Sequence, residues 1–167
     1  VGGGGGAGSS YCGEGGAGYT TTVRSVVLTA NTAYPIVVGA AGTNGNPSSA
    51  GGETTAFTAS AAGGKNTSNG TSSSKRPGGA GGSGGAGYVS PTTTTTGGTD
   101  GGDGTSSATA GGKGQGTTTR EFGEADGDLY ASGGGSNLSA TVANSGNGGR
   151  NGITSIEPAD GIVVIRQ

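Results

Sequence analysis

The chain opens with VGGGGGAG at residues 1–8, and tracts of this kind decide how it can fold. Glycine makes up 44 of the 167 residues, and further tracts lie at 78–87 and 133–135. Glycine loses more backbone entropy on folding than any other residue, so a folded chain this rich in it must benefit from the missing side chains. The benefit we expect is close packing of backbone against backbone, in extended helices with three residues per turn.

The phase of the tracts and the scarcity of large apolar residues limit the kind of core that can form. Collagen is excluded, because its glycine recurs at every third residue with abundant proline, whereas this chain has 5 prolines and tracts of irregular phase. Valine, isoleucine, leucine and phenylalanine supply only 20 of 167 residues, below the level of roughly one fifth at which disorder becomes the default interpretation. Disorder is therefore an alternative. The small net charge and the tract pattern favour an ordered single glycine-rich domain over residues 1–167.

Charge and hydropathy exclude two classes of partner. The net charge is −2, and the 8 lysines and arginines are dispersed, with Lys75-Arg76 as the strongest pair, so we expect no nucleic-acid partner. No apolar run approaches the roughly 18 residues of a membrane span, so we expect no membrane insertion. The chain starts at Val1 without methionine, and we expect the domain to be the end of a longer chain or a processed product.

The absence of histidine removes most catalytic chemistry. Without it the Ser-His-Asp and Cys-His arrangements and the usual zinc ligand sets cannot form, and we expect the lone thiol of Cys12 to be inert. Five carboxylates come near calcium-binding spacings but lack the rest of those motifs. They are Asp100, Asp103, Glu124, Asp126 and Asp128. We expect them to lie in solvated turns, and we expect no enzyme activity, no cofactor and no metal.

Segments rich in valine, threonine and isoleucine predict a few short strands. Residues 20–28 and 33–38 flank a turn at 29–32 and predict a β-hairpin. A third strand is expected at 54–60 and a buried closing strand at 162–165. The helical period is absent, so the predicted fold is mostly irregular and all-β, with packed polyglycine II-like helices, a β-hairpin, a short C-terminal strand and no α-helix.

Four stretches of the chain form a recognisable set. They are VGGGGG at 1–6, AYPIVVGAAG at 33–42, TAF at 55–57 and GIVVIR at 161–166. Together they resemble the glycine-rich terminal domain of bacteriophage tail fibres, over the whole chain, although the middle tracts here are shorter and more diluted by threonine, serine and asparagine. The resemblance implies layered polyglycine-type helices behind variable loops, at the distal end of a virion's tail fibre. The implied partners are a host cell-surface receptor, either a glycan or an outer-membrane protein, and the remainder of the fibre.

Side chains between the glycine tracts are the candidates for recognition. Tyrosine and arginine suit this role because they offer a large contact area at a modest cost in entropy. The receptor-binding candidates are Tyr11, Tyr88, Arg120, Phe122 and Tyr130. Each tyrosine has a structural alternative, in which it merely covers exposed backbone beside a tract.

If successive tracts run antiparallel, the loops between them alternate between two ends of the domain. Counting reversals from Val1 places one set of loops at the end away from the fibre and the other set near the attachment. The far loops are 9–12, 43–49, 88–96 and 117–130, and the near loops are 20–38, 65–77, 105–109 and 137–145. The far set holds all five receptor-binding candidates.

A structural or ice-binding glycine-rich extracellular protein is the competing class. Flat bundles of glycine helices can present rows of threonine to a lattice, and the five threonines at 92–96 suit that idea by composition. Their spacing argues against it, because consecutive residues point in successive directions around an extended helix.

Overall fold

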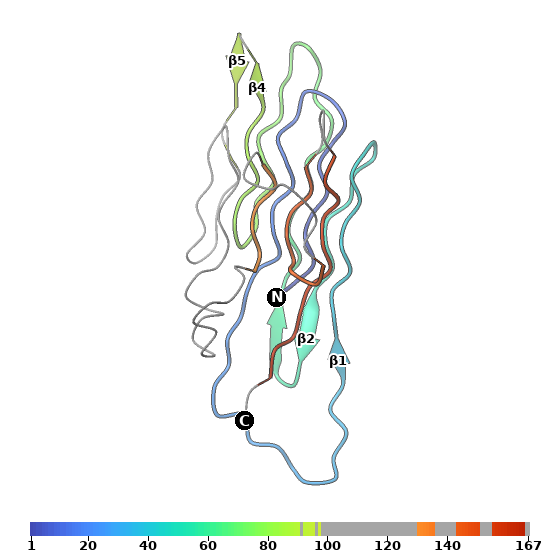
Figure 1. Cartoon of the computed structure of the whole chain (residues 1–167), viewed down its shortest axis with the longest axis vertical. Helices are drawn as coiled ribbons and strands as arrows, with labels where there is room; N and C mark the ends of the chain where they lie inside the picture. The colour runs from blue at the N-terminus through green and yellow to red at the C-terminus, as the bar shows by residue number, and fades with distance from the viewer. Residues whose placement is uncertain (91, 96, 98–129, 136–142, 151–154, 166–167) are drawn as a thin grey trace.

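The computed structural model describes residues 1–90, 92–95, 97, 130–135, 143–150 and 155–165. The described segments run up and down the long axis of an elongated molecule, side by side (Figure 1). They contain no helix and only two small antiparallel sheets. The prediction of a mostly irregular, all-β glycine-rich fold is therefore confirmed.

Five strands make up the two sheets. The first sheet has the order β1-β2-β3, with β1 at Ile36–Val37, β2 at Thr54–Ala56 and β3 at Ala59–Ala61. The second pairs β4 at Val89–Ser90 with β5 at Thr93–Thr94. The sheets lie towards opposite ends of the long axis, and Figure 1 shows β4 and β5 at its upper end.

The predicted hairpin at 20–38 is wrong. Strand β1 pairs with β2, Ile36 opposite Ala56, and no part of 20–28 is in a strand. The two limbs instead form a wide loop at the lower end of the molecule (Figure 1). The valines at 23, 26 and 27 favour a strand by composition, but a strand there needs one covered face, and Val27 is 92% exposed.

The predictions for the other two strands also need correction. Residues 54–60 hold a tight hairpin, not one strand, because the chain reverses at Phe57, whose φ of 55° lies in the left-handed region. The C-terminal run at 162–165 is not a strand in the described structure. Ile162 exchanges backbone bonds with Val1 at 2.8 and 3.0 Å, but the residues beyond it form no ladder.

The glycine tract at 1–8 bonds outward, to a different neighbour with each successive residue. Residues 2–6 donate to three segments in rotation, and every third residue returns to the same segment. The five bonds are Gly2 N to Tyr19 O (3.0 Å), Gly3 N to Gly52 O (3.0 Å), Gly4 N to Ala159 O (2.8 Å), Gly5 N to Gly16 O (2.8 Å) and Gly6 N to Ser49 O (2.9 Å). A period of three with no internal hydrogen bonds is the pattern of an extended three-residue helix packed among others.

The carbonyl groups of the same tract accept from three more segments. Gly64 N bonds to Gly3 O, Gly42 N to Gly4 O, and Gly149 N to Gly5 O, at 2.7 to 2.9 Å. The tract therefore lies at the centre of six neighbouring segments. Residues 13–19 repeat the pattern: Glu14 N and Ala17 N donate to 83–86, Gly15 N and Gly18 N to 146–149, and Gly16 N and Tyr19 N to 62–65. This is the predicted packing of polyglycine II-like helices.

The core of the bundle is backbone. In the part of the chain that the structure describes, the largest fully buried side chains are Ser83 and Ser145, and the buried apolar residues are alanines apart from Ile156. Among the described residues no buried side-chain nitrogen or oxygen lacks a hydrogen-bond partner. No helix in the described part of the chain is long and apolar enough to cross a membrane. Stability therefore comes from hydrogen-bonded backbones in contact, which constrains the loops very little.

Candidate functional site

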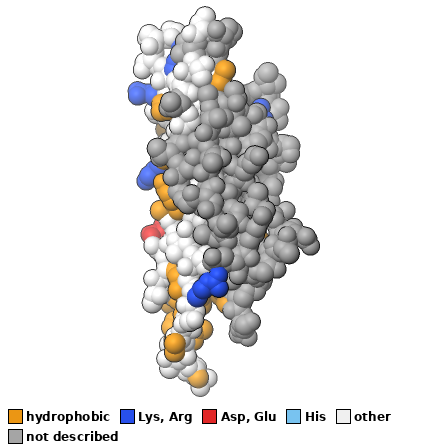
Figure 2. Space-filling model, turned by 90° about the vertical axis from the view of Figure 1, so that its left-hand side faces the viewer, with side chains coloured by type: hydrophobic (Ala, Val, Ile, Leu, Met, Phe, Trp, Pro, Cys, Tyr) orange, Lys and Arg blue, Asp and Glu red, His pale blue; other side chains and the backbone are white. Residues whose placement is uncertain are grey.

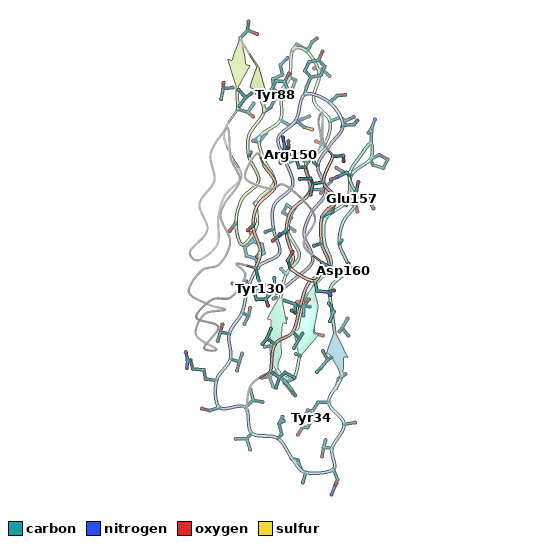
Figure 3. The ribbon with its side chains drawn as sticks, viewed as in Figure 1. Tyr34, Tyr88, Tyr130, Arg150, Glu157 and Asp160 are labelled. Atoms are coloured by element: carbon teal, nitrogen blue, oxygen red, sulfur yellow. The ribbon has the colours of Figure 1, made fainter. Side chains whose placement is uncertain are left out.

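Three loops meet at the upper end of the bundle, which we call the loop end. They are 8–13, 69–76 and 88–95. The first two are joined by backbone bonds from Gly70 N to Ser10 O (2.9 Å) and from Arg76 N to Tyr11 O (3.1 Å). The label of Tyr88 marks this end in Figure 3, far from Tyr34 at the other end. The loop end thus gathers chain segments that are far apart in sequence, from residue 8 to residue 95.

Thr95 fastens the third loop to the other two. Its hydroxyl accepts from Tyr88 N (2.7 Å) and donates to Arg76 O (3.1 Å), while its own amide donates to Tyr88 O (2.8 Å). The β4–β5 hairpin is therefore closed at its base by one residue, which also ties it to residue 76. This positions Tyr88 beside the loop that carries Tyr11.

Two tyrosines and a lysine form a cluster at this end. The ring centroids of Tyr11 and Tyr88 are 6.0 Å apart with an interplanar angle of 53°, a tilted arrangement favoured for aromatic pairs. The Lys75 ammonium lies 4.5 Å from the Tyr11 centroid and 6.0 Å from that of Tyr88, within cation–π range of both. Tyr11 is 42% exposed, so the cluster is open to solvent.

The loop at 71–74 holds the lysine in place. Lys75 Nζ donates to the carbonyl oxygens of Thr71 (3.3 Å) and Ser72. The carbonyls are presented by a tight turn, in which Thr71 N donates to Ser74 O (2.8 Å) and Ser74 N returns to Thr71 O (3.2 Å). An ammonium has three donors, so two are used by these carbonyls and one remains.

Tyr11 has a strained backbone. Its φ is 48°, in the left-handed region that costs a residue with a Cβ roughly 1–2 kcal/mol. Such strain persists only where the surroundings fix it, and here residue 11 is held by the bond from Arg76 N. The strained geometry directs the Tyr11 ring to Tyr88 and Lys75.

The predicted site residues are divided by the structure. Tyr11 and Tyr88 lie together, as predicted, whereas Tyr130 lies away from them, nearer the lower end (Figure 3). Arg120 and Phe122 lie outside the described residues, as do the carboxylates Asp100, Asp103, Glu124, Asp126 and Asp128. The expectation that Tyr130 lies at the same end as Tyr11 and Tyr88 is therefore wrong.

The predicted sorting of loops also fails for 65–77, which lie at the loop end with 9–12. The β2–β3 hairpin adds one reversal that counting tracts misses. A second reversal lies at 82–83: residues 79–82 run parallel to 14–17, and 83–86 run antiparallel to them. Two uncounted reversals leave the direction of the chain unchanged, so the predicted placement of 88–95 at the same end as 9–12 is correct. The loop 105–109 lies outside the described residues.

The lower end carries most of the exposed apolar surface. A groove of about 390 Å³ is lined by the wide loop, the β2–β3 hairpin, Tyr130 and the C-terminal run. Its large apolar residues include Val23, Val26, Leu28, Phe57 and Ile162. Figure 2 shows hydrophobic side chains gathered over the lower part of the described surface. The rings of Tyr34 and Phe57 pack here at 5.7 Å. The two ends of the molecule therefore differ in character.

Lys75 is the part of the site that sequence reasoning missed. It drew attention only as half of the strongest basic pair, and the reversal count placed it at the wrong end. Cys12 lies in the same loop as Tyr11, and burial raises the pKa of its thiol, so the thiol stays protonated at neutral pH. Among the described residues no three of histidine, cysteine, aspartate and glutamate come together as a metal site.

Comparison with known proteins gives one match. A family model described as a glycine-rich domain matches residues 1–166, nearly the whole chain. No curated protein and no solved structure matches the chain.

Proposed function

The chain belongs to this glycine-rich domain family, and from that premise we propose that it is a receptor-binding domain at the tip of a bacteriophage tail fibre. It attaches to the host cell surface through the loop end. The observation that carries the proposal is the Tyr11–Tyr88–Lys75 cluster, built by three loops on a backbone-packed scaffold.

The scaffold supports this function because it separates folding from recognition. The central tract at 2–6 is held by backbone bonds to six neighbouring segments, and those bonds do not depend on which side chains occupy the loops. Loops on a rigid scaffold can change sequence at little cost to stability, which suits a surface that must follow a changing receptor. Tyrosine is also a residue that binding surfaces favour.

The proposed role is binding and not catalysis. The chain has no histidine, and the cluster pairs two phenol rings with an ammonium, a combination suited to contact and charge recognition. The proposed partners are a host receptor at the loop end and the remainder of the fibre, with the domain carried on the virion. Arg120, Phe122 and Tyr130 stay candidates from sequence.

The ice-binding alternative has less support. Thr93 and Thr94 form a strand of a two-residue-per-strand hairpin, and the hydroxyl of Thr95 is used internally. A two-residue strand is too short to present the several spaced rows of threonine that a lattice would need. Thermal hysteresis, if measured in solutions of the purified domain, would favour this alternative.

A cell-adsorption assay tests the proposal. Fluorescently labelled protein is incubated with a panel of bacterial strains, and bound fluorescence is compared between the native chain and the double variant Tyr11→Ala, Tyr88→Ala. We expect the double variant to lose at least about tenfold in adsorption on every strain that the native chain binds, since interface aromatic residues are energetic hot spots. Tyr34→Ala is the matched control at the opposite end, and its adsorption should be unchanged.

Folding of each variant is checked by its thermal unfolding midpoint. Equal adsorption by the native chain and a well-folded double variant would show that the loop end is not the binding surface. Absence of adsorption to every strain, together with thermal hysteresis, would replace the proposal with the ice-binding function.

A further inference from the structure

We infer that the ligand of the loop end is an anionic saccharide, one that carries phosphate or carboxylate groups. The inference rests on the proposed function and specifies its receptor. It comes from three features of the loop end: an open aromatic surface, a positioned ammonium that forms no ion pair with any described residue, and a rim of hydroxyl and amide groups.

The tyrosine pair supplies the contact surface. An aromatic ring is negative on its face, and the C–H groups of a sugar ring carry partial positive charge, so a pyranose can lie against an exposed tyrosine. Tyr11 is 42% exposed, and Tyr88 stands beside it at a 53° tilt. Because Tyr11 is held by the bond from Arg76 N and Tyr88 by its bonds with Thr95, binding needs little further ordering of these residues.

The lysine supplies the charge. Two of its three donors are taken by Thr71 O and Ser72 O, which leaves one N–H for a ligand. Arg76 follows it in sequence with an exposed side chain. Within the described part of the chain neither residue forms an ion pair. Two neighbouring cations beside an exposed ring favour an anionic group on whatever binds there.

The rim supplies short polar groups. The Asn69 carboxamide accepts from Ser9 N (2.7 Å) and donates to Ser9 Oγ (3.0 Å), and the hydroxyls of Thr71 and Ser73 lie 3.2 Å apart. All four side chains are exposed or only half-buried. Rigid hydroxyl and amide groups around aromatic rings can match the many hydroxyl groups of a saccharide.

The same surface fits a protein receptor less well. A protein interface has an apolar centre, and the exposed large hydrophobic residues that the structure describes lie mostly in the wide loop, β1 and the C-terminal run. At the loop end they are Tyr11 and Val89. The observations therefore favour a glycan receptor over a protein receptor.

Titration calorimetry of the full chain tests the inference with defined probes. The probes are a phosphorylated lipopolysaccharide core oligosaccharide, the same oligosaccharide after removal of its phosphates, a uronic-acid oligosaccharide and inorganic phosphate. We expect binding to a charged oligosaccharide that weakens as salt is raised, because Lys75 and Arg76 are exposed to screening. The phosphorylated and uronic-acid arms distinguish the two sources of negative charge.

Substitutions then assign the contact. Lys75→Gln should weaken binding of the charged oligosaccharide about tenfold and leave any binding of the dephosphorylated one unchanged, while Lys75→Arg should retain most of the affinity. Lys65→Gln, at an exposed lysine of the scaffold, is the matched control and should have no effect.

The failure of this inference is distinguishable from that of the proposed function. If cells adsorb the native chain through Tyr11 and Tyr88, but protease treatment of the cells abolishes adsorption and no charged oligosaccharide binds, the receptor is a protein and the inference is overturned. An affinity of Lys75→Gln for the charged oligosaccharide equal to that of the native chain overturns it as well. If the native chain adsorbs to no cells, the proposed function itself fails.

Discussion

Replacing Gly4 by alanine tests whether the core is made of backbone in direct contact. Gly4 lies in the central tract, surrounded by six segments. A Cβ added there would stand 2.5 Å from the carbonyl carbon of Asn147 and closer still to its oxygen. Carbon atoms pack comfortably at about 3.5–4.0 Å, so the backbone around Asn147 would have to retreat by roughly 1 Å. No flexible side chain is available to move instead.

The loss of stability can be worked out from the backbone bonds that break when the Asn147 segment moves. Three backbone bonds hold the 146–149 segment at this level, and they join Ala159 N to Asn147 O (2.9 Å), Gly18 N to Gly146 O (2.8 Å) and Gly149 N to Gly5 O (2.8 Å). Each is worth about 1 kcal/mol net, and overpacking of a tight core adds about 1–3 kcal/mol. Alanine also restricts the unfolded chain, which offsets about 0.4–1 kcal/mol. We expect Gly4→Ala to lower the free energy of unfolding by about 3–5 kcal/mol.

Urea denaturation followed by circular dichroism measures this change, and the thermal midpoint should fall by about 10 °C at the usual scaling for a chain of this length. Gly45→Ala is the matched control. An added Cβ there meets nothing within 4 Å, but the φ of 122° is unfavourable for alanine. The control should therefore cost only the backbone strain of about 1–3 kcal/mol. If Gly4→Ala is as stable as the native chain, or costs less than Gly45→Ala, close backbone packing is not what holds the bundle together.

Three further predictions concern single side chains. Thr54→Val should lower the free energy of unfolding, measured by urea denaturation, by about 2–4 kcal/mol. The buried Thr54 hydroxyl accepts from Gly39 N (2.8 Å) and donates to Val1 O (2.7 Å), and both partners would lose their bond. Thr55→Val, one residue along β2, is the control and should lower it far less. Bonds from Thr29 lower the pKa of Tyr34, so its phenolate is favoured in the folded state. This contribution to stability is present at alkaline pH and is lost as pH falls through the folded pKa. In a spectroscopic titration, Tyr34→Phe should remove a tyrosine step that lies below the usual range of a phenol, and an unchanged curve would contradict the assignment. The Cys12 thiol should react with a disulfide reagent at least about tenfold more slowly in the folded protein than in urea, since partial burial raises its pKa, and equal rates would contradict its half-buried placement.

The candidate site could be predicted only in part from sequence. Tyr11 and Tyr88 stand between glycine tracts, and the residue types suited to recognition identify them. Lys75 could not be assigned to them, because its position depends on how many times the chain reverses between residues 49 and 88. The reversal at Phe57 needs a left-handed residue that is not glycine, and the one at 82–83 lies inside a glycine-rich tract, so neither has a clear signal.

The sequence by itself determined the kind of packing. A tract such as residues 2–6 has no Cβ atoms, so its backbone can bond outward on all sides, and the period of three is a property of the extended helix itself. The absence of helix and the scarcity of strand among the described residues follow from the same composition. These are local properties of the chain, and they can be read from it without knowledge of its neighbours.

Only the tertiary structure decided which segments are neighbours. In a side-chain core, shape and hydrophobic pattern select partners, whereas one glycine tract offers the same surface as another. Gly2 bonds to Tyr19 and Gly3 to Gly52 because the lengths of the loops and turns bring those segments there. The wide loop at 20–35 illustrates the same point. Its valines suggest a strand, but β2 pairs with Ile36–Val37 and not with this segment. Local sequence specifies that the backbones pack, and the closure of the chain as a whole specifies their order.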